Sequence, residues 1–147
     1  MAKVRKLKLA SKRPSVDDLD DLARIYVMLR DKGKCRVCGS TRYLQTAHFI
    51  TRSNKHTRWD EDNLFLLCSG CHTMRMNSWH KDPATATEWV RKTLGEKEFD
   101  KLRMRANDTS KIDRNAIKVY LKAKINELSS PSEFLGNEVM REVNDGY

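Results

Sequence analysis

The chain has 147 residues, of which 39% are hydrophobic and 33% are charged, and its formal net charge is +9. A chain of this size fits one domain with a modest core. No segment approaches the roughly 18 consecutive apolar residues of a membrane-spanning helix, so no membrane partner is expected. The excess of positive charge favours a polyanionic partner, with nucleic acid as the first candidate.

The chain begins with a basic segment that leads into a helix. Residues 1–14 are rich in lysine and arginine and contain no acid, which predicts a flexible basic arm that contacts phosphates. This segment lacks the apolar run of a secretory signal, so the protein is expected in the cytoplasm. Ser15 and Asp18 have the spacing of a capping box and predict the start of a helix, and Gly33 predicts its end.

The chain has only four cysteines, and they form two Cys-x-x-Cys pairs: Cys35 with Cys38, and Cys68 with Cys71. A two-residue spacer directs both thiolates of a pair toward one point, which favours a tetrahedral zinc ion over disulfides in a reducing compartment. A site with four thiolate ligands leaves no open position for a substrate. The zinc is therefore expected to be structural.

The region around the cysteines is predicted to contain two strands and a helix. The apolar pattern predicts strands over 43–50 and 63–67, joined by a polar, basic loop over 51–62. The second cysteine pair leads into a helix predicted over 69–80. On one straight helix His72 and His80 would lie about two turns, or some 12 Å, apart, so they are not expected to share an ion directly.

Three further helices are predicted after this region, over 82–95, 96–106 and 110–128. The first of them begins with Asp82 as the cap and Pro83 at the first helical position. Residues 129–147 are acidic and are predicted to be a mobile tail.

The histidines and the asparagine placed among the cysteines resemble those of a known enzyme family. The residues that carry the resemblance are Ala47-His48-Phe49-Ile50, Thr57-Arg58-Trp59-Asp60-Glu61-Asp62-Asn63-Leu64 and Leu67-Cys68-Ser69-Gly70-Cys71-His72. They are similar to the HNH nucleases, also called ββα-metal or His-Me finger nucleases. Within that superfamily the chain looks most like the phage NinG-type recombination nucleases, and phage endonuclease VII has a similar zinc frame.

This resemblance implies an α+β, mostly α fold: a small ββα-metal core with structural zinc, flanked by N- and C-terminal helices. The expected organisation is a single nuclease domain over 15–128, with the zinc and ββα core at 34–81 and a helical extension at 82–128. The resemblance also implies roles for three residues: His48 activates water, Asn63 fixes the loop, and His72 holds a catalytic Mg²⁺ or Mn²⁺.

One position departs from the family pattern. Many members carry a metal-binding Asp or His directly before the histidine of the first strand, and this chain has Ala47. If His48 is the base, a strand ligand is missing. If His48 is itself a metal ligand, then His56, His80 or a water held by Arg52 must supply the base, so both assignments stay open.

The expected function is a metal-dependent DNA endonuclease that hydrolyses phosphodiester bonds by a one-metal mechanism. Arg52, Lys55 and Arg58 of the basic loop are expected to contact DNA. The resemblance implies a duplex or branched recombination intermediate of phage DNA as the substrate, in the cytoplasm of a bacterial host, with a homodimer as one arrangement. The alternative is a zinc-stabilised DNA-binding or adaptor module without catalysis.

Overall fold

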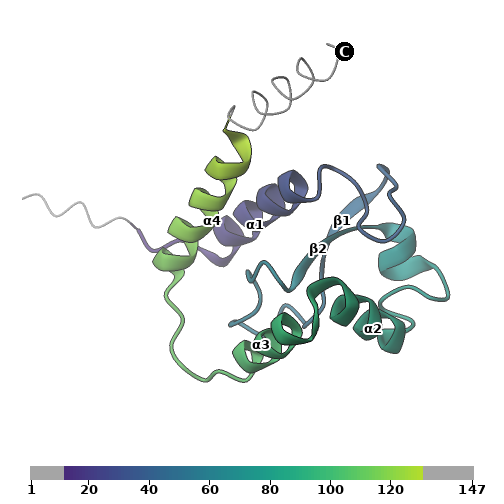
Figure 1. Ribbon diagram of the computed structural model, residues 1–147. Coiled ribbons are helices and arrows are strands. Elements are labelled where there is room, and N and C mark those ends of the chain that lie inside the picture. The colour runs from purple at the N-terminus through teal and green to yellow at the C-terminus, as the bar shows by residue number, and fades with distance from the viewer. Residues whose placement is uncertain (1–11, 131–147) are drawn as a thin grey trace, which may run out of the picture.

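The computed structural model describes residues 12–130 (Figure 1). Most of the predicted arm (1–11) and of the predicted acidic tail (131–147) lies outside the described residues. The elements in chain order are α1 (Val16–Arg30), β1 (Leu44–His48), β2 (Leu64–Cys68), the π-helix η1 (Gly70–Met74), α2 (Pro83–Leu94), α3 (Glu96–Ala106) and α4 (Arg114–Ser129). The predicted fold class is confirmed: the protein is mostly helical around a small antiparallel sheet and a four-cysteine cluster. Among residues 12–130 no helix combines the length and apolar character needed to cross a membrane.

The two-stranded hairpin forms the middle layer of the molecule. β1 and β2 are antiparallel, with Ala47 opposite Phe65, and every residue of β2 is buried. Successive side chains of a strand point to opposite faces. Phe65 and Leu67 therefore pack in one cluster with α2 and α3, while Leu64 and Leu66 pack in a second cluster with α1 and α4. Figure 1 shows the two helix pairs on opposite sides of the hairpin.

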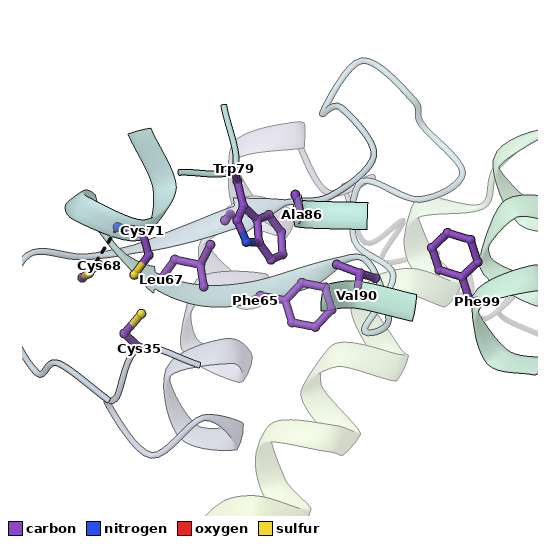
Figure 2. Close-up of a cluster of buried hydrophobic side chains, with 10 residues drawn as sticks. Cys35, Phe65, Leu67, Cys68, Cys71, Trp79, Ala86, Val90 and Phe99 are labelled. Atoms are coloured by element: carbon purple, nitrogen blue, oxygen red, sulfur yellow. Dashed lines mark hydrogen bonds between the residues drawn. The ribbon is translucent and has the colours of Figure 1, made fainter. Parts of the chain in front are cut away.

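The cluster that contains Phe65 and Leu67 links the cysteines to the helices α2 and α3. Figure 2 shows Cys35, Cys68 and Cys71 at one end of this cluster and Phe99 of α3 at the other. Trp79 lies between them, with its ring centroid 5.4 Å from that of Phe65. The cysteine cluster and the aromatic side chains therefore belong to one continuous core.

The helix α1 begins and ends as predicted. The Ser15 hydroxyl accepts a hydrogen bond from the Asp18 N–H (3.0 Å), and the Asp18 carboxylate accepts one from the Ser15 N–H (2.8 Å). The chain leaves the helix through Gly33, whose φ of +62° lies in the left-handed region that glycine tolerates. The helices predicted over 82–95 and 96–106 are confirmed as α2 and α3.

The helix predicted over 69–80 is wrong. Only Gly70–Met74 is helical, as a short π-helix, and Arg75 is extended with ψ of 157°. The chain then returns on itself, with hydrogen bonds from the Trp79 N–H to the Cys71 carbonyl (3.0 Å) and from the His80 N–H to the His72 carbonyl (3.1 Å). Burial of the Trp79 indole in the core explains the reversal, because a straight helix would carry this side chain some 12 Å past Cys71.

The start of the last helix also differs from the prediction. The helix was expected from residue 110 but begins at Arg114, because the Asp113 carboxylate accepts hydrogen bonds from the N–H groups of Asn115 and Ala116. An N-cap residue has non-helical backbone angles, so Asp113 defines the boundary.

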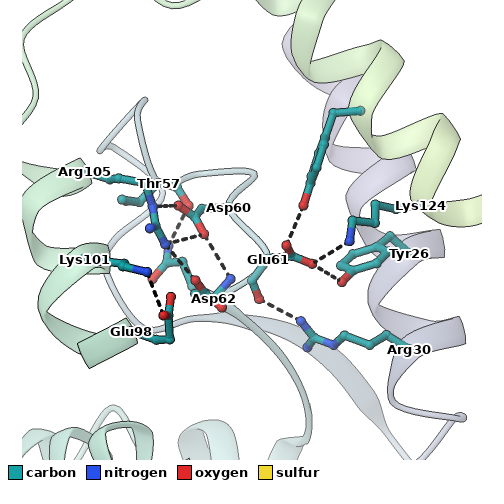
Figure 3. Close-up of polar contacts among 12 residues, drawn as sticks. Tyr26, Arg30, Thr57, Asp60, Glu61, Asp62, Glu98, Lys101, Arg105 and Lys124 are labelled. Atoms are coloured by element: carbon teal, nitrogen blue, oxygen red, sulfur yellow. Dashed lines mark hydrogen bonds and ion pairs between the residues drawn. The ribbon is translucent and has the colours of Figure 1, made fainter. Parts of the chain in front are cut away.

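The loop between the strands is held from both sides. Arg105 of α3 forms ion pairs with Asp60 (2.5 Å) and Asp62 (2.8 Å). On the other side, the Glu61 carboxylate accepts hydrogen bonds from the hydroxyls of Tyr26 in α1 (2.7 Å) and Tyr120 in α4 (2.5 Å). Figure 3 shows Arg105 facing Asp60 and Glu61 facing Tyr26. The two helical layers therefore fix the conformation of this loop.

Candidate functional site

The four cysteines converge on one point. Their sulfur atoms all lie within 4.8 Å of one another, and the sulfurs of Cys38 and Cys68 are 3.6 Å apart. This separation is far from the roughly 2.05 Å of a disulfide and close to the roughly 3.8 Å expected between two thiolates of a tetrahedral zinc site. The cluster therefore fits a structural metal such as zinc, which would join the segment before β1, the end of β2 and η1.

Asn63 is fully buried and ties the loop to the end of β1. Its side-chain oxygen accepts a hydrogen bond from the Ile50 N–H (2.6 Å). Its side-chain nitrogen donates to the carbonyls of Ile50 (2.9 Å) and Thr57 (2.8 Å). One amide thus satisfies three backbone groups, which agrees with the loop-fixing role that the resemblance implies for this residue.

His48 is the last residue of β1, and its Nε2 lies 3.0 Å from the Arg58 carbonyl oxygen. A carbonyl can only accept, so Nε2 carries the proton and Nδ1 keeps a free lone pair. Burial lowers the pKa of His48 to about 4, outweighing the opposing effect of this hydrogen bond. The ring is therefore neutral at pH 7 and has one acceptor nitrogen.

His72 and His80 face one another, which corrects the prediction that they lie some 12 Å apart. Their Nε2 atoms are 3.1 Å apart, because the chain reversal after η1 returns His80 to the side of His72. The Nδ1 of His72 donates to the side-chain oxygen of Gln45 (2.7 Å), which leaves its Nε2 unprotonated. Burial and the neighbouring His80 lower the pKa of His72, which favours the neutral ring.

These histidines share one cavity of about 380 Å³. It is lined by Thr46, His48, Thr51, Arg52, His72 and His80. The cavity thus combines a neutral imidazole with a free nitrogen, a pair of facing imidazoles and an exposed guanidinium. Such a combination can take up a proton, bind a cation and attract a phosphate.

Three other predicted site residues lie elsewhere. Arg58 forms an ion pair with Asp20 of α1 (2.7 Å), so its guanidinium holds the loop against that helix. His56 has its Nδ1 3.8 Å from an Asp108 carboxylate oxygen. Lys55 and His56 line a different cavity, beside the start of α4.

Ala47 is fully buried and packs in the same cluster as the cysteines and Trp79. This position holds no polar side chain, and the polar residues of the same strand are Gln45, Thr46 and His48. The sequence reasoning missed Gln45, although its position two residues before Ala47 puts both on one face of the strand. It also missed Asp20, whose carboxylate accepts hydrogen bonds from Arg58 (2.7 Å) and from the Trp59 indole (2.8 Å).

The two antiparallel strands, the four-cysteine cluster and the short helix η1 together are consistent with a small ββα core that holds a structural metal such as zinc. Residues 35–78 of this chain match the family model of the HNH endonucleases. The matched stretch contains all four cysteines together with His48, Asn63 and His72, while His80 lies just beyond it. Comparison with curated proteins and with solved structures gave no match.

Proposed function

We propose that this protein is a metal-dependent DNA endonuclease that hydrolyses phosphodiester bonds. One observation carries the proposal: His48, His72 and His80 line the same cavity. The His48 ring has one nitrogen with a free lone pair, and the rings of His72 and His80 face each other. Hydrolysis of a phosphodiester needs an activated water, a cation at the phosphate and fixed geometry. The match to the HNH endonuclease model supports the assignment of these tasks to this cavity.

His48 is assigned as the general base. The Arg58 carbonyl fixes the proton on Nε2, so Nδ1 is the atom that accepts a proton from the attacking water. Because the ring is neutral well below pH 7, the base is available without prior deprotonation. Asn63 contributes indirectly, since its bond to the Thr57 carbonyl fixes the loop residue next to Arg58.

His72 and His80 are assigned as the protein ligands of the catalytic ion. A separation of 3.1 Å between their Nε2 atoms is that of two nitrogens each about 2.1 Å from a shared ion. The donation from His72 to Gln45 orients the ring and fixes its tautomer, as is common for metal-binding histidines. A divalent ion held there would neutralise charge on the scissile phosphate and the leaving oxygen.

This ligand set has two consequences. His80 replaces the strand ligand that Ala47 cannot supply, so His48 is free to act as the base. Imidazole nitrogens bind Mn²⁺ and later transition metals better than Mg²⁺, which prefers oxygen ligands. Mn²⁺ is therefore proposed as a better activator than Mg²⁺.

A cleavage assay tests this proposal. Supercoiled, linear and branched DNA are incubated with the protein and either Mn²⁺ or Mg²⁺. We expect His48→Ala and His72→Ala to abolish cleavage while DNA affinity and zinc content are unchanged. His56→Ala is the matched control, because this histidine lies outside the cavity, and it should cleave normally. Undiminished cleavage by both His48→Ala and His72→Ala would contradict the proposal.

The second candidate is a zinc-stabilised DNA-binding or adaptor module without catalysis. Buried Ala47 favours it, because the strand then contributes no metal ligand at that position. The same assay separates the two candidates. Salt-sensitive DNA binding without cleavage in any divalent metal would favour the module.

The finer features of the proposal rest on resemblance to the NinG-type recombination nucleases. They are a branched recombination intermediate of phage DNA as the substrate, action in the cytoplasm of a bacterial host, and a homodimer that cuts two strands. Cleavage rates on junction, flap, single-stranded and duplex substrates test the first, and sedimentation of the protein with and without DNA tests the last.

A further inference from the structure

A second cavity is lined by residues 53–56 of the loop between the strands and by the start of α4, and it is basic. Its volume is about 520 Å³, and its cationic lining residues are Arg13, Lys55, Lys111 and Arg114. Within residues 12–130 none of these four forms an ion pair with a carboxylate. The one carboxylate that lines the cavity, Asp108, already accepts hydrogen bonds from the N–H and hydroxyl of Ser110 (2.8 and 3.0 Å).

Arg114 has a donor without a partner in this region. Its Nε is buried and makes no hydrogen bond among the described residues, although its Nη1 donates to the Pro14 carbonyl (3.3 Å). The Nε atom has no exposed surface, so an anion in the cavity would meet Arg114 through the outer donors of its guanidinium. Arg114 is also the first residue of α4, where the helix dipole adds positive potential.

Hydrogen bonds of Asn54, which lines the basic cavity, fix the loop between the strands. The Asn54 side chain donates to the Ala106 carbonyl (2.8 Å) and accepts from the N–H groups of His56 (3.1 Å) and Thr57 (3.3 Å). Arg52 lines the histidine cavity and Lys55 lines the basic one. The Cα atoms of Arg52 and Lys55 are three residues apart and therefore lie within about 10 Å of each other, so both side chains can contact phosphates of the same DNA strand.

We propose that this basic cavity binds a backbone phosphate of the DNA substrate a few nucleotides from the bond that is cut. This inference rests on the proposed function for its substrate class. The phosphate would lie between Lys55, Lys111 and Arg114, so the site would set the register of the strand relative to His48. Contacts of this kind position nucleic acid without reading its bases.

Salt-dependent binding tests the proposal. Binding of the full chain to a fluorescent duplex is measured by anisotropy at several salt concentrations, without divalent metal. Each lost phosphate contact lowers the slope of log K against log salt by about 0.9. Because the cavity holds one phosphate, we expect Lys55→Gln with Lys111→Gln to lower the magnitude of this slope by at most about one. The control, Lys34→Gln with Lys92→Gln, removes the same charge from exposed lysines outside the cavity and should change it little.

An unchanged slope in the cavity variant, or an equal loss in the control, would overturn the proposal. The four lysines are exposed, so their replacement should not affect folding, which thermal melting checks. Because the assay needs no cleavage, its result is independent of the nuclease proposal. If the slope is smaller in the cavity variant and the wild-type protein never cuts DNA, the phosphate site is supported and the nuclease proposal is rejected.

Discussion

Replacement of Asn63 by alanine should destabilise the protein more than most single substitutions. The Asn63 side chain is fully buried and satisfies three backbone groups, namely the N–H and carbonyl of Ile50 and the carbonyl of Thr57. Each buried group left without a partner costs about 1–3 kcal/mol. Since water can reach part of the loop after truncation, we expect a loss of about 3–5 kcal/mol. A domain of this size is stable by only about 5–15 kcal/mol.

Urea unfolding of zinc-loaded protein, followed by circular dichroism, measures this loss. Asn115→Ala is the control, because Asn115 is exposed on α4 and its change should stay within about 0.5 kcal/mol. Asn63→Asp adds a second comparison, since a carboxylate oxygen would then face the two carbonyls that now accept from the amide. A loss below about 1 kcal/mol in Asn63→Ala would refute the argument that this amide holds the loop.

Three further predictions concern the metal sites and pH. Cys68→Ser should lose bound zinc and much of its helical signal, as measured by zinc content and circular dichroism; full zinc occupancy would contradict the four-thiolate site. His80→Ala should weaken Mn²⁺ binding by about 10-fold or more, measured by quenching of the neighbouring Trp79 fluorescence, and an unchanged affinity would exclude the histidine pair. The folded protein keeps His48 neutral down to pH about 4, whereas the unfolded chain protonates it near 6.5. The unfolded state then binds more protons in this window, so the free energy of unfolding should fall by about 3 kcal/mol from pH 6.5 to 4. The His48→Gln variant should not show this contribution to the decrease. Identical pH profiles of the free energy of unfolding in the variant and the wild type would contradict the prediction.

Local sequence patterns predicted most elements well, because short-range interactions decide them. The capping box at Ser15 and the Asp82-Pro83 start of α2 depend on groups a few residues apart, and both are present. The paired spacing of the cysteines likewise predicted their convergence. The last helix starts later than expected because the Asp113 carboxylate accepts from the first N–H groups of the helix and so sets its boundary.

The error over 69–80 has a different cause. Residues 75–80 contain no glycine or proline, so nothing local ended the predicted helix. The chain reversal follows from burial of Trp79 against Phe65, a residue that is distant in sequence. No periodicity within the segment could indicate that contact.

The sequence alone therefore determined the chemical types at the site: four thiolates for a structural metal, a strand histidine, a loop asparagine and a second histidine beside the last cysteine. It also determined the match to the HNH endonuclease model. The tertiary structure alone decided that His80 faces His72, that Gln45 orients His72, and that Arg58 pairs with Asp20. Two of these contacts join residues that are distant in sequence, and the His72–His80 contact depends on the chain reversal that burial of Trp79 produces. Packing of the core, rather than local propensity, therefore brings these residues together.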